Sequence, residues 1–493
     1  MKRRFAPLAD SPRQRLAPRP HSCCPRVFRT LALAAATVVS AVAHAQTSPG
    51  PDVVVSSLNA FLKNGTVGDI TAYSMATTAC NIGGMEAAWD AASNTHPVIA
   101  QNLYRLEAGR FEHIGLAWLK HAFCATNEPG CGTCQPTGCE TMGVNCADTY
   151  GSTTNAAQGS LGPRSEVNPF TGLYPFPYGA AGMTGNAIYK RLQVHNSDLD
   201  PAAHPTALYF GEAIYITTDE QPWGTADNNA SYRRVTVGAF DNGGYTLQFT
   251  GPMSQEAFAI MAWQDQDPDV ELSFVNVPGD GFMILGFKAS QLGPGSWHYE
   301  YALYNYNSHR GARSFLVPTP ASATITNIGF HDVDYHSGET LSGVDWSASV
   351  TPSGVLWETE FFTVDPNANA LRWGSLYNFR FDCDLAPATA VGSVGIFRPG
   401  LASVLTVPTV APSVCMTPDF VRGDLNGDLA VNLVDVIQLL THLFNGGPAP
   451  APPQAGDSND DGATNLVDAI YTLGYLFQMG PPPPFPFPTP GCL

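Results

Sequence analysis

The C-terminal part of the chain carries one motif twice: GDLNGDLAVNLVDVIQLLTHLF (423–444) and GDSNDDGATNLVDAIYTLGYLF (456–477). The two copies align without a gap. Oxygen-bearing side chains recur at loop positions 1, 3, 5, 9 and 12: Asp424, Asn426, Asp428, Asn432 and Asp435 in the first copy, and Asp457, Asn459, Asp461, Asn465 and Asp468 in the second. A twelve-residue loop with this spacing is typical of calcium sites, where the position 7 carbonyl (Ala430, Ala463) is a further ligand. The sequence therefore predicts two bound Ca²⁺ ions.

Each loop leads directly into an apolar pattern with helical spacing. The first consists of Val436, Ile437, Leu439, Leu440, Leu443 and Phe444, and the second of Ala469, Ile470, Leu473, Leu476 and Phe477. Helices this short are unstable alone, so we expect them to pack together and to fold with the metal. Position 6 needs a sharp turn, which Gly462 suits better than Leu429, so the second site is expected to bind more tightly. The alternative is that Asp, Asn and Gly only form turns here.

This duplicated loop–helix pattern, over about 421–480, resembles the type I dockerin module, a family of small calcium-binding domains. The five side-chain ligand positions carry over onto the residues named above, with Asp435 and Asp468 at position 12 as in that family. The resemblance implies docking to a cohesin-like or cell-surface protein, often by proteins that degrade polysaccharides. At loop positions 10 and 11 the family usually has small hydroxyl residues, whereas this chain has Leu433–Val434 and Leu466–Val467.

Residues 1–45 have the features of an export signal. Eight basic residues precede an apolar run, 31–42, which is followed by Ala43-His44-Ala45, a small-x-small cleavage pattern. The alternative is an N-terminal membrane anchor, but the run is short for a bilayer span. No later stretch is apolar enough to cross a membrane. We therefore expect the mature chain to be secreted or held at the cell surface, with no transmembrane anchor.

The charge of the mature chain limits its partners. Without residues 1–45 it has 16 basic and 41 acidic residues, a net charge of −25. Nucleic acids and anionic membranes need a basic face, so this composition argues against both as partners. It is compatible with divalent cations and with neutral polysaccharides.

The cysteines also indicate export. Cys80 and the five cysteines of CATNEPGCGTCQPTGCETMGVNC (124–146) are enough for three disulfides. The alternative is a zinc site that includes Cys131 and Cys134. Cys383 and Cys415 bracket the end of the main domain and are expected to pair, which leaves Cys492 as the odd thiol.

The rest of the chain predicts a mainly β protein. After position 204, about ten short apolar or alternating runs are separated by turn signals, which favours an antiparallel β-sandwich or jelly-roll-like domain. We expect an irregular, disulfide-rich part before them, with a short helix at MEAAWDAASN (85–94). The expected divisions are an export signal (1–45), the irregular part (46–204), the sandwich-like part (205–406), a linker (407–417), the all-α dockerin-like module (418–480) and an extended, unpacked Pro-rich tail (481–493).

Several segments of the main domain are similar to a family of uncharacterised secreted bacterial proteins. They are NTHPVIAQNLYRL (94–106), LGPRSEVN (161–168), WHYEYALYNYN (297–307) and NIGFHDVDYHSG (327–338). The similarity implies no activity.

The segment HDVDYH (331–336) is the densest group of metal-ligating residue types in the main domain. On a strand, Asp332, Asp334 and His336 would share one face, and His121 or His195 would complete a metal site from elsewhere. The alternative is a solvated strand face with a histidine capping the turn that follows.

Glycoside hydrolysis requires two carboxyl groups on either side of one bond. The candidates are Glu300, Glu358, Glu360, Asp332 and Asp334, and an aromatic stripe of Trp297, Tyr299 and Tyr301 would stack on sugar rings. The alternative for the stripe is the core of a sandwich. No motif of a lipase, NTPase, zincin or dinucleotide-binding enzyme is present.

Two functions from different classes are consistent with these patterns. The first is a secreted, non-catalytic calcium-binding protein whose β-rich domain is displayed through a docking module. The second is an O-glycosyl hydrolase of polysaccharide catabolism, targeted by the same module. The sequence favours the first, because the second depends on analogy with other dockerin-bearing proteins.

Overall fold

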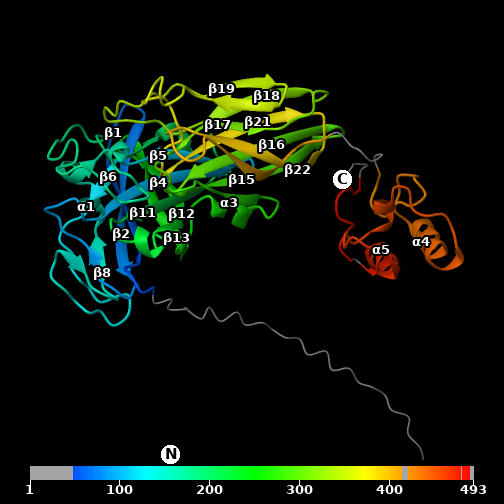
Figure 1. Ribbon diagram of the computed structural model, residues 1–493, viewed down its shortest axis with the longest axis horizontal. Coiled ribbons are helices and arrows are strands. Elements are labelled where there is room, and N and C mark those ends of the chain that lie inside the picture. Colours follow the sequence, from blue (N-terminus) through cyan, green and yellow to red (C-terminus); the bar gives the residue numbers. More distant parts are fainter. Residues whose placement is uncertain (1–47, 414–419, 479, 489–493) are drawn as a thin grey trace, which may run out of the picture. The chain divides into compact units, whose positions relative to one another are not determined.

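A computed structural model of the chain describes residues 48–413, 420–478 and 480–488 (Figure 1). The expected export signal, Cys415 and Cys492 lie outside these residues. Strands dominate residues 48–413, and every pairing between neighbouring strands is antiparallel. The structure therefore confirms a mainly β protein. Within the described residues, no helix has the length and apolarity to span a membrane.

Residues 53–121 contain long regular strands, so the expectation of an irregular N-terminal part is wrong there, whereas much of 125–185 is loop and turn as expected. The segment 85–94, expected to be helical, contains a short strand and turns instead. Strands β2 and β4 are buried on both faces, so apolar and polar residues do not alternate strictly along them. The sequence pattern therefore did not reveal them as strands. One sheet contains β1 (Val53–Val67), β2 (Ile70–Asn81), β8 (Ala147–Tyr150) and β10 (Leu192–His195), and β3 (Ala87–Ala88) pairs with β7 (Thr141–Met142).

The expected boundary at 204/205 lies between strands of one sheet, so it separates no structural units. β11 pairs along its whole length with β4, from Leu208 opposite Leu106 to Ile216 opposite Val98. This seven-stranded sheet contains β13 (Gly244–Ser254), β12 (Ala230–Asp241), β11 (Leu208–Ile216), β4 (Val98–Glu107), β6 (Leu119–His121), β9 (Leu161–Gly162) and β5 (Arg110–Leu116).

Two five-stranded sheets follow. The first contains β14 (Glu271–Asn276), β15 (Phe282–Gly293), β16 (Ser296–Asn305), β21 (Ser375–Cys383) and β18 (Ile325–His331). The second contains β19 (Ser347–Thr351), β20 (Gly354–Glu358), β17 (Ala312–Val317), β22 (Pro387–Ile396) and β23 (Val404–Pro412). β23 occupies most of the expected linker 407–417, because its inward residues Val407 and Ala411 are buried in the core.

The first five-stranded sheet is buried on both faces. Along β16, Tyr299 and Tyr301 enter a core shared with the second five-stranded sheet, whereas Ala302 and Tyr304 enter a core shared with the seven-stranded sheet. Alternate residues of a strand face opposite sides, so this strand separates two cores. The aromatic stripe of β16 is thus core, as the alternative interpretation predicted.

Three disulfides secure the segment 124–146. They join Cys80 to Cys131, Cys124 to Cys139, and Cys134 to Cys146, which rules out the alternative zinc site on these thiols. Cys383 is a buried free thiol. The short helical segments of this part are α1 (Ser152–Asn155), η1 (Gln158–Ser160), η2 (Arg164–Glu166), α2 (Asn196–Leu199), η3 (Gln221–Trp223) and α3 (Met261–Gln266).

Two helices occupy the positions expected after the repeat loops, and a short turn of 3₁₀-helix precedes the second loop: α4 (Leu433–Asn445), η4 (Pro453–Gly456) and α5 (Leu466–Gln478). α4 and α5 pack through Val436, Leu439 and Ala469, together with Leu440, Leu443, Leu473 and Leu476. The rest of the expected apolar stripe does not join this core. Ile437, Phe444, Ile470 and Phe477 lie on the solvent side of the helices.

Candidate functional site

The first and last acidic residues of the first repeat loop hold it from both ends. The carboxylate of Asp424 accepts a hydrogen bond from the amide of Leu429 at 2.8 Å. The carboxylate of Asp435 accepts from the amides of Leu425 and Asn432, each at 2.9 Å. Asp435 and Asn432 also form a capping box, which begins α4 directly behind the loop.

The second loop repeats this arrangement 33 residues later. Asp457 accepts from the amide of Gly462 at 2.9 Å, at the position equivalent to Leu429. Asp468 accepts from the amides of Asn459 (3.3 Å) and Asn465 (2.8 Å). The two sequences therefore fold into the same loop in the same register.

The remaining expected ligands lie between these carboxylates on the same loops. Burial raises the pKa of Asp435 and of Asp468, and the loop amides that donate to them oppose this rise. The described residues, loops included, hold no group of three or more His, Cys, Asp or Glu side chains already placed to share a metal. The other polar contacts are Asn426 with Asp428 (2.8 Å), Asn432 with the Ala430 carbonyl (3.0 Å), Asn459 with Asp461 (2.9 Å) and Asn465 with the Ala463 carbonyl (2.9 Å).

The loops differ in the residues that take left-handed backbone conformations. In the first loop these are Gly427 (φ 74°) and Leu429 (φ 67°); in the second they are Asp460 (φ 60°) and Gly462 (φ 84°). A left-handed leucine is strained, whereas Asp tolerates this region and Gly adopts it freely. The first loop therefore carries backbone strain that the second lacks.

Arg422 joins the second loop to the Pro-rich tail. Its side chain is fully buried; it donates to the carbonyls of Asp457 (2.6 Å) and Phe485 (3.0 Å) and forms an ion pair with Asp460 at 2.9 Å. Its backbone amide donates to the carbonyl of Pro486. The expectation of an unpacked tail is therefore wrong for residues 480–488, because these carbonyls bind a buried guanidinium.

The solvent sides of α4 and α5 carry apolar residues at equivalent repeat positions. Ile437 and Phe444 are 55% and 66% exposed, and their equivalents Ile470 and Phe477 are 60% and 66% exposed. The residues at loop positions 10 and 11, Leu433, Val434, Leu466 and Val467, are also exposed. We call these eight residues the paired apolar stripes. Solvent-exposed apolar patches of this kind mark interaction surfaces.

In the β-rich part, the segment 331–336 borders a cleft of about 510 Å³, which we call the histidine cleft. His113 from β5, His195 from β10 and His331 from β18 line it, together with Asp332 and Asp334. Strand β18 ends at His331, so residues 332–336 do not alternate between two strand faces as expected. They leave the sheet and form one wall of the cleft.

The structure brings together only part of the expected metal site. His195 contacts Asp334 at 3.4 Å, and both line the cleft. His336 also lines it, but one ring nitrogen contacts the Leu116 carbonyl (2.8 Å), and burial lowers its pKa to about 4. His121 lies elsewhere, 2.9 Å from His96. These residues thus form a polar cleft without a preassembled metal-ligand cluster.

Two residues of the cleft that sequence reasoning missed are His113 and Asp198. His113 is fully buried; one ring nitrogen faces the Gly115 carbonyl at 3.0 Å and the other has no partner. Burial holds its pKa well below the usual value, so the ring is neutral. No local pattern marks either residue, because they reach the cleft through strand pairing across distant segments.

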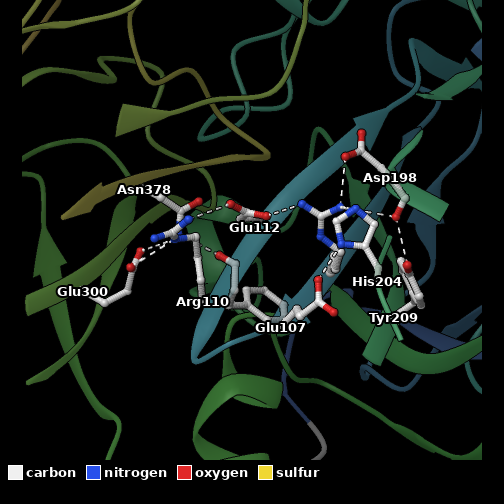
Figure 2. Close-up of polar contacts among 10 residues, drawn as sticks. Glu107, Arg110, Glu112, Asp198, His204, Tyr209, Glu300 and Asn378 are labelled. Atoms are coloured by element: carbon white, nitrogen blue, oxygen red, sulfur yellow. Dashed lines mark hydrogen bonds and ion pairs between the residues drawn. The ribbon is translucent and has the colours of Figure 1, made fainter. Parts of the chain in front are cut away.

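A chain of charged groups connects the cleft to the first five-stranded sheet (Figure 2). Asp198, which lines the cleft, pairs with Arg105 at 3.0 Å, and Arg105 pairs with Glu112 at 2.6 Å. Glu112 lies 3.5 Å from Arg110, whose side chain binds Glu300 at 3.0 Å. Glu300 is therefore held by an arginine of β5.

The other carboxyl candidates for glycoside hydrolysis lie apart. Glu358 ends β20 and pairs with Arg313 at 2.6 Å, while Glu360 is exposed beyond the strand. Asp332 borders the histidine cleft, where burial raises its pKa to about 6. Asp334 borders the same cleft with an exposed side chain. Asp332 and Asp334 thus share the histidine cleft, and Glu358 and Glu360 share a second pocket, of about 420 Å³.

A scan of the chain against models of protein families found no match, and a search of curated proteins found no similar sequence.

Proposed function

We propose that this chain is an exported protein whose residues 420–488 bind two calcium ions and dock a β-rich domain onto another protein. The observation that carries the proposal is the pair of repeat loops with identical hydrogen-bond register. Three carboxylates, two side-chain amides and one carbonyl per loop are the hard oxygen donors that Ca²⁺ prefers. The resemblance to dockerins agrees with this donor set.

The paired apolar stripes support docking to a protein. Each stripe lies on a short helix whose first turn is fixed by the loop, so calcium would hold the surface in shape. Leu433–Val434 and Leu466–Val467 make this surface more apolar than the hydroxyl residues usual in dockerins. We therefore propose a cohesin-like or other cell-surface partner that presents a complementary apolar patch.

The β-rich part supports an extracellular context. Its three disulfides suit an oxidising compartment. We propose that its two five-stranded sheets form a two-layer sandwich around their common core, which includes Tyr301, Phe315 and Phe379. The histidine cleft beside this sandwich is the best-formed site for a polar ligand such as a neutral glycan.

Titration calorimetry on the full chain tests calcium binding. We expect two bound Ca²⁺ ions per chain, one ion in either Asp435→Ala or Asp468→Ala, and none in the double variant. Asp365→Ala, which removes a half-buried aspartate of the β-rich part, is the matched control and should still bind two. Absence of calcium uptake by the unaltered chain would refute the proposal.

The second candidate, an O-glycosyl hydrolase, is favoured by one observation. Asp332, with its raised pKa, and the exposed Asp334 face the same cleft, which resembles the division between a general acid and an ionised partner. Release of reducing sugars from a polysaccharide panel, lost in Asp332→Asn and retained in Asp365→Asn, would establish this activity. No release from any polysaccharide would leave the cleft as a binding site.

A further inference from the structure

A small pocket lies where the loop before β21 meets the ends of β5 and β22. Four of its lining residues carry basic side chains: Arg164, His309, Arg372 and Arg398. We call it the arginine pocket. This grouping is unusual in a chain with a large excess of acidic residues.

The cations of the arginine pocket lack carboxylate partners. None of its arginines forms an ion pair with any described residue. Arg164 is satisfied by neutral oxygens, including the carbonyls of Gln101 (2.9 Å) and Gly374 (3.0 Å). Arg372 and Arg398 are the two arginines that have N–H groups without an acceptor in the part of the chain that the structure describes.

The side chain of Arg372 is only partly satisfied. It donates to the carbonyls of Pro366 (3.0 Å) and Ala368 (3.1 Å), but its Nε is buried without a partner. The Arg398 guanidinium makes no hydrogen bond to the described part of the chain and lies 5.0 Å from the centre of the Phe362 ring. Burial and then the charge of Arg372 lower the pKa of Arg398, and the charge of Asp280 opposes this shift.

Two nearby carboxyl groups, Glu339 and Asp280, offset the charge of these arginines only in part. Glu339 accepts from the hydroxyl of Ser165 at 3.0 Å through Oε1, its Oε2 is buried without a partner among the residues described, and burial raises its pKa. Asp280 accepts from the hydroxyl of Ser308 and from the amide of Arg310, each at 2.8 Å. Three arginines against two carboxyl groups leave a net positive charge in a partly buried pocket, so an anion from outside would stabilise it.

We propose that the arginine pocket binds the carboxylate of a small, otherwise neutral ligand, with Arg372 and Arg398 as hydrogen-bond donors. The enclosed space is about 20 Å³, room for one or two water-sized atoms, which suits carboxylate oxygens better than a tetrahedral sulfate or phosphate. Tyr335 lines both this pocket and the histidine cleft. This shared residue makes a sugar acid the proposed ligand class, with its carboxylate in the pocket and its hydroxyls toward the cleft.

Titration calorimetry with sodium glucuronate, at constant ionic strength and CaCl₂, tests this proposal on the full chain. Binding is expected for glucuronate, and about tenfold weaker or undetectable binding for glucose, because a charge-assisted hydrogen bond is worth about 1.5–3 kcal/mol. Arg398→Gln should weaken glucuronate binding by about tenfold or more. Arg234→Gln, which removes an exposed arginine of β12, is the matched control and should bind normally.

Three results would overturn the proposal. They are no binding of glucuronate, equal binding of glucose, and binding of sulfate that is as strong as that of glucuronate. The comparison of the three ligands uses the unaltered chain, so it holds even if Arg398→Gln folds poorly. The proposal is independent of calcium docking. Variants of Asp435 and Asp468 should therefore bind glucuronate normally.

Discussion

The repeat loops of residues 420–488 take all their expected ligands from twelve consecutive residues each, whereas the histidine cleft of residues 48–413 takes His113, His195 and His331 from three distant strands. The first arrangement depends on local turns and, as we propose, on one bound cation per loop. The second depends on strand pairing, disulfides and buried charge across the whole β-rich part. The difference implies that the two regions should fail under different conditions.

Removal of calcium should have the largest effect and should be confined to residues 420–488. A site with micromolar affinity at millimolar calcium contributes about 4 kcal/mol. We expect chelator to abolish amide-exchange protection in α4 and α5 and to leave the strands of the β-rich part unchanged, as measured by hydrogen-exchange mass spectrometry. If α4 and α5 were as well protected in chelator as in calcium, the proposed difference between residues 420–488 and the β-rich part would be wrong.

Loss of a disulfide should destabilise the β-rich part and leave residues 420–488 unaffected. Cys80 and Cys131 are separated by 51 residues, and a bridge of this length stabilises the folded state by about 4 kcal/mol. The double variant Cys80→Ser/Cys131→Ser should lower the melting temperature of the β-rich part and leave calcium binding by residues 420–488 intact. Calorimetric scanning and calcium titration on the same samples distinguish the two effects.

The charged chain of Figure 2 continues through Glu300 to His298, and this end should make the stability of the β-rich part depend on pH. Hydrogen bonding to Glu300, opposed by burial and aided by Asp382, raises the pKa of His298. The stabilisation that charged His298 contributes is therefore complete below its unfolded-state pKa near 6.5. It is lost as pH rises through the higher pKa of His298 in the folded state.

The variant His298→Gln should cost about 1.5 kcal/mol at pH 6 and much less at pH 9, because only the charged ring gains from both carboxylates. Urea unfolding at the two pH values measures this difference. His195→Gln, at a more exposed position, is the control and should show a smaller change. An equal cost of His298→Gln at both pH values would contradict the charge argument.

The smallest effect should distinguish the two loops from each other. Leu429→Gly relieves a left-handed leucine and should strengthen calcium binding by the first loop by about 1 kcal/mol, or roughly fivefold. Gly462→Leu should weaken the second loop by a similar amount, since a side chain there meets no atoms but takes the same strained backbone. Titration calorimetry of both variants would show whether backbone strain sets the order of affinities.

The sequence predicted the elements that depend on local chemistry. The repeat helices cover the apolar patterns from Val436 and Ala469, because capping and apolar spacing are local properties. Each helix begins three residues earlier than its pattern, at Leu433 or Leu466. The crowded cysteines around Cys131 were also correctly interpreted as disulfides, because their number and an oxidising context suffice. The two loops also share equivalent hydrogen bonds from Leu429 and Gly462 to the first aspartate of each loop.

The failures concern residues whose environment is set by distant segments. Strands β2 and β4 were missed because burial on both faces removed the alternation that reveals a half-buried strand. The Pro-rich stretch at Val407 was interpreted as a linker, although a proline at the edge of a sheet is tolerated and β23 lies at that edge. Asp332 and His336 were placed on a strand that ends at His331.

The hydrogen bond from the Arg422 amide to the Pro486 carbonyl places the two flanks of the repeat region beside each other. A unit with adjacent flanks can be cut out and grafted into a surface turn of an unrelated scaffold without stretching either attachment point. It also tolerates circular permutation, with new termini opened between α4 and η4. We therefore expect residues 420–488 to be transferable as one unit, with Arg422 joining its two ends.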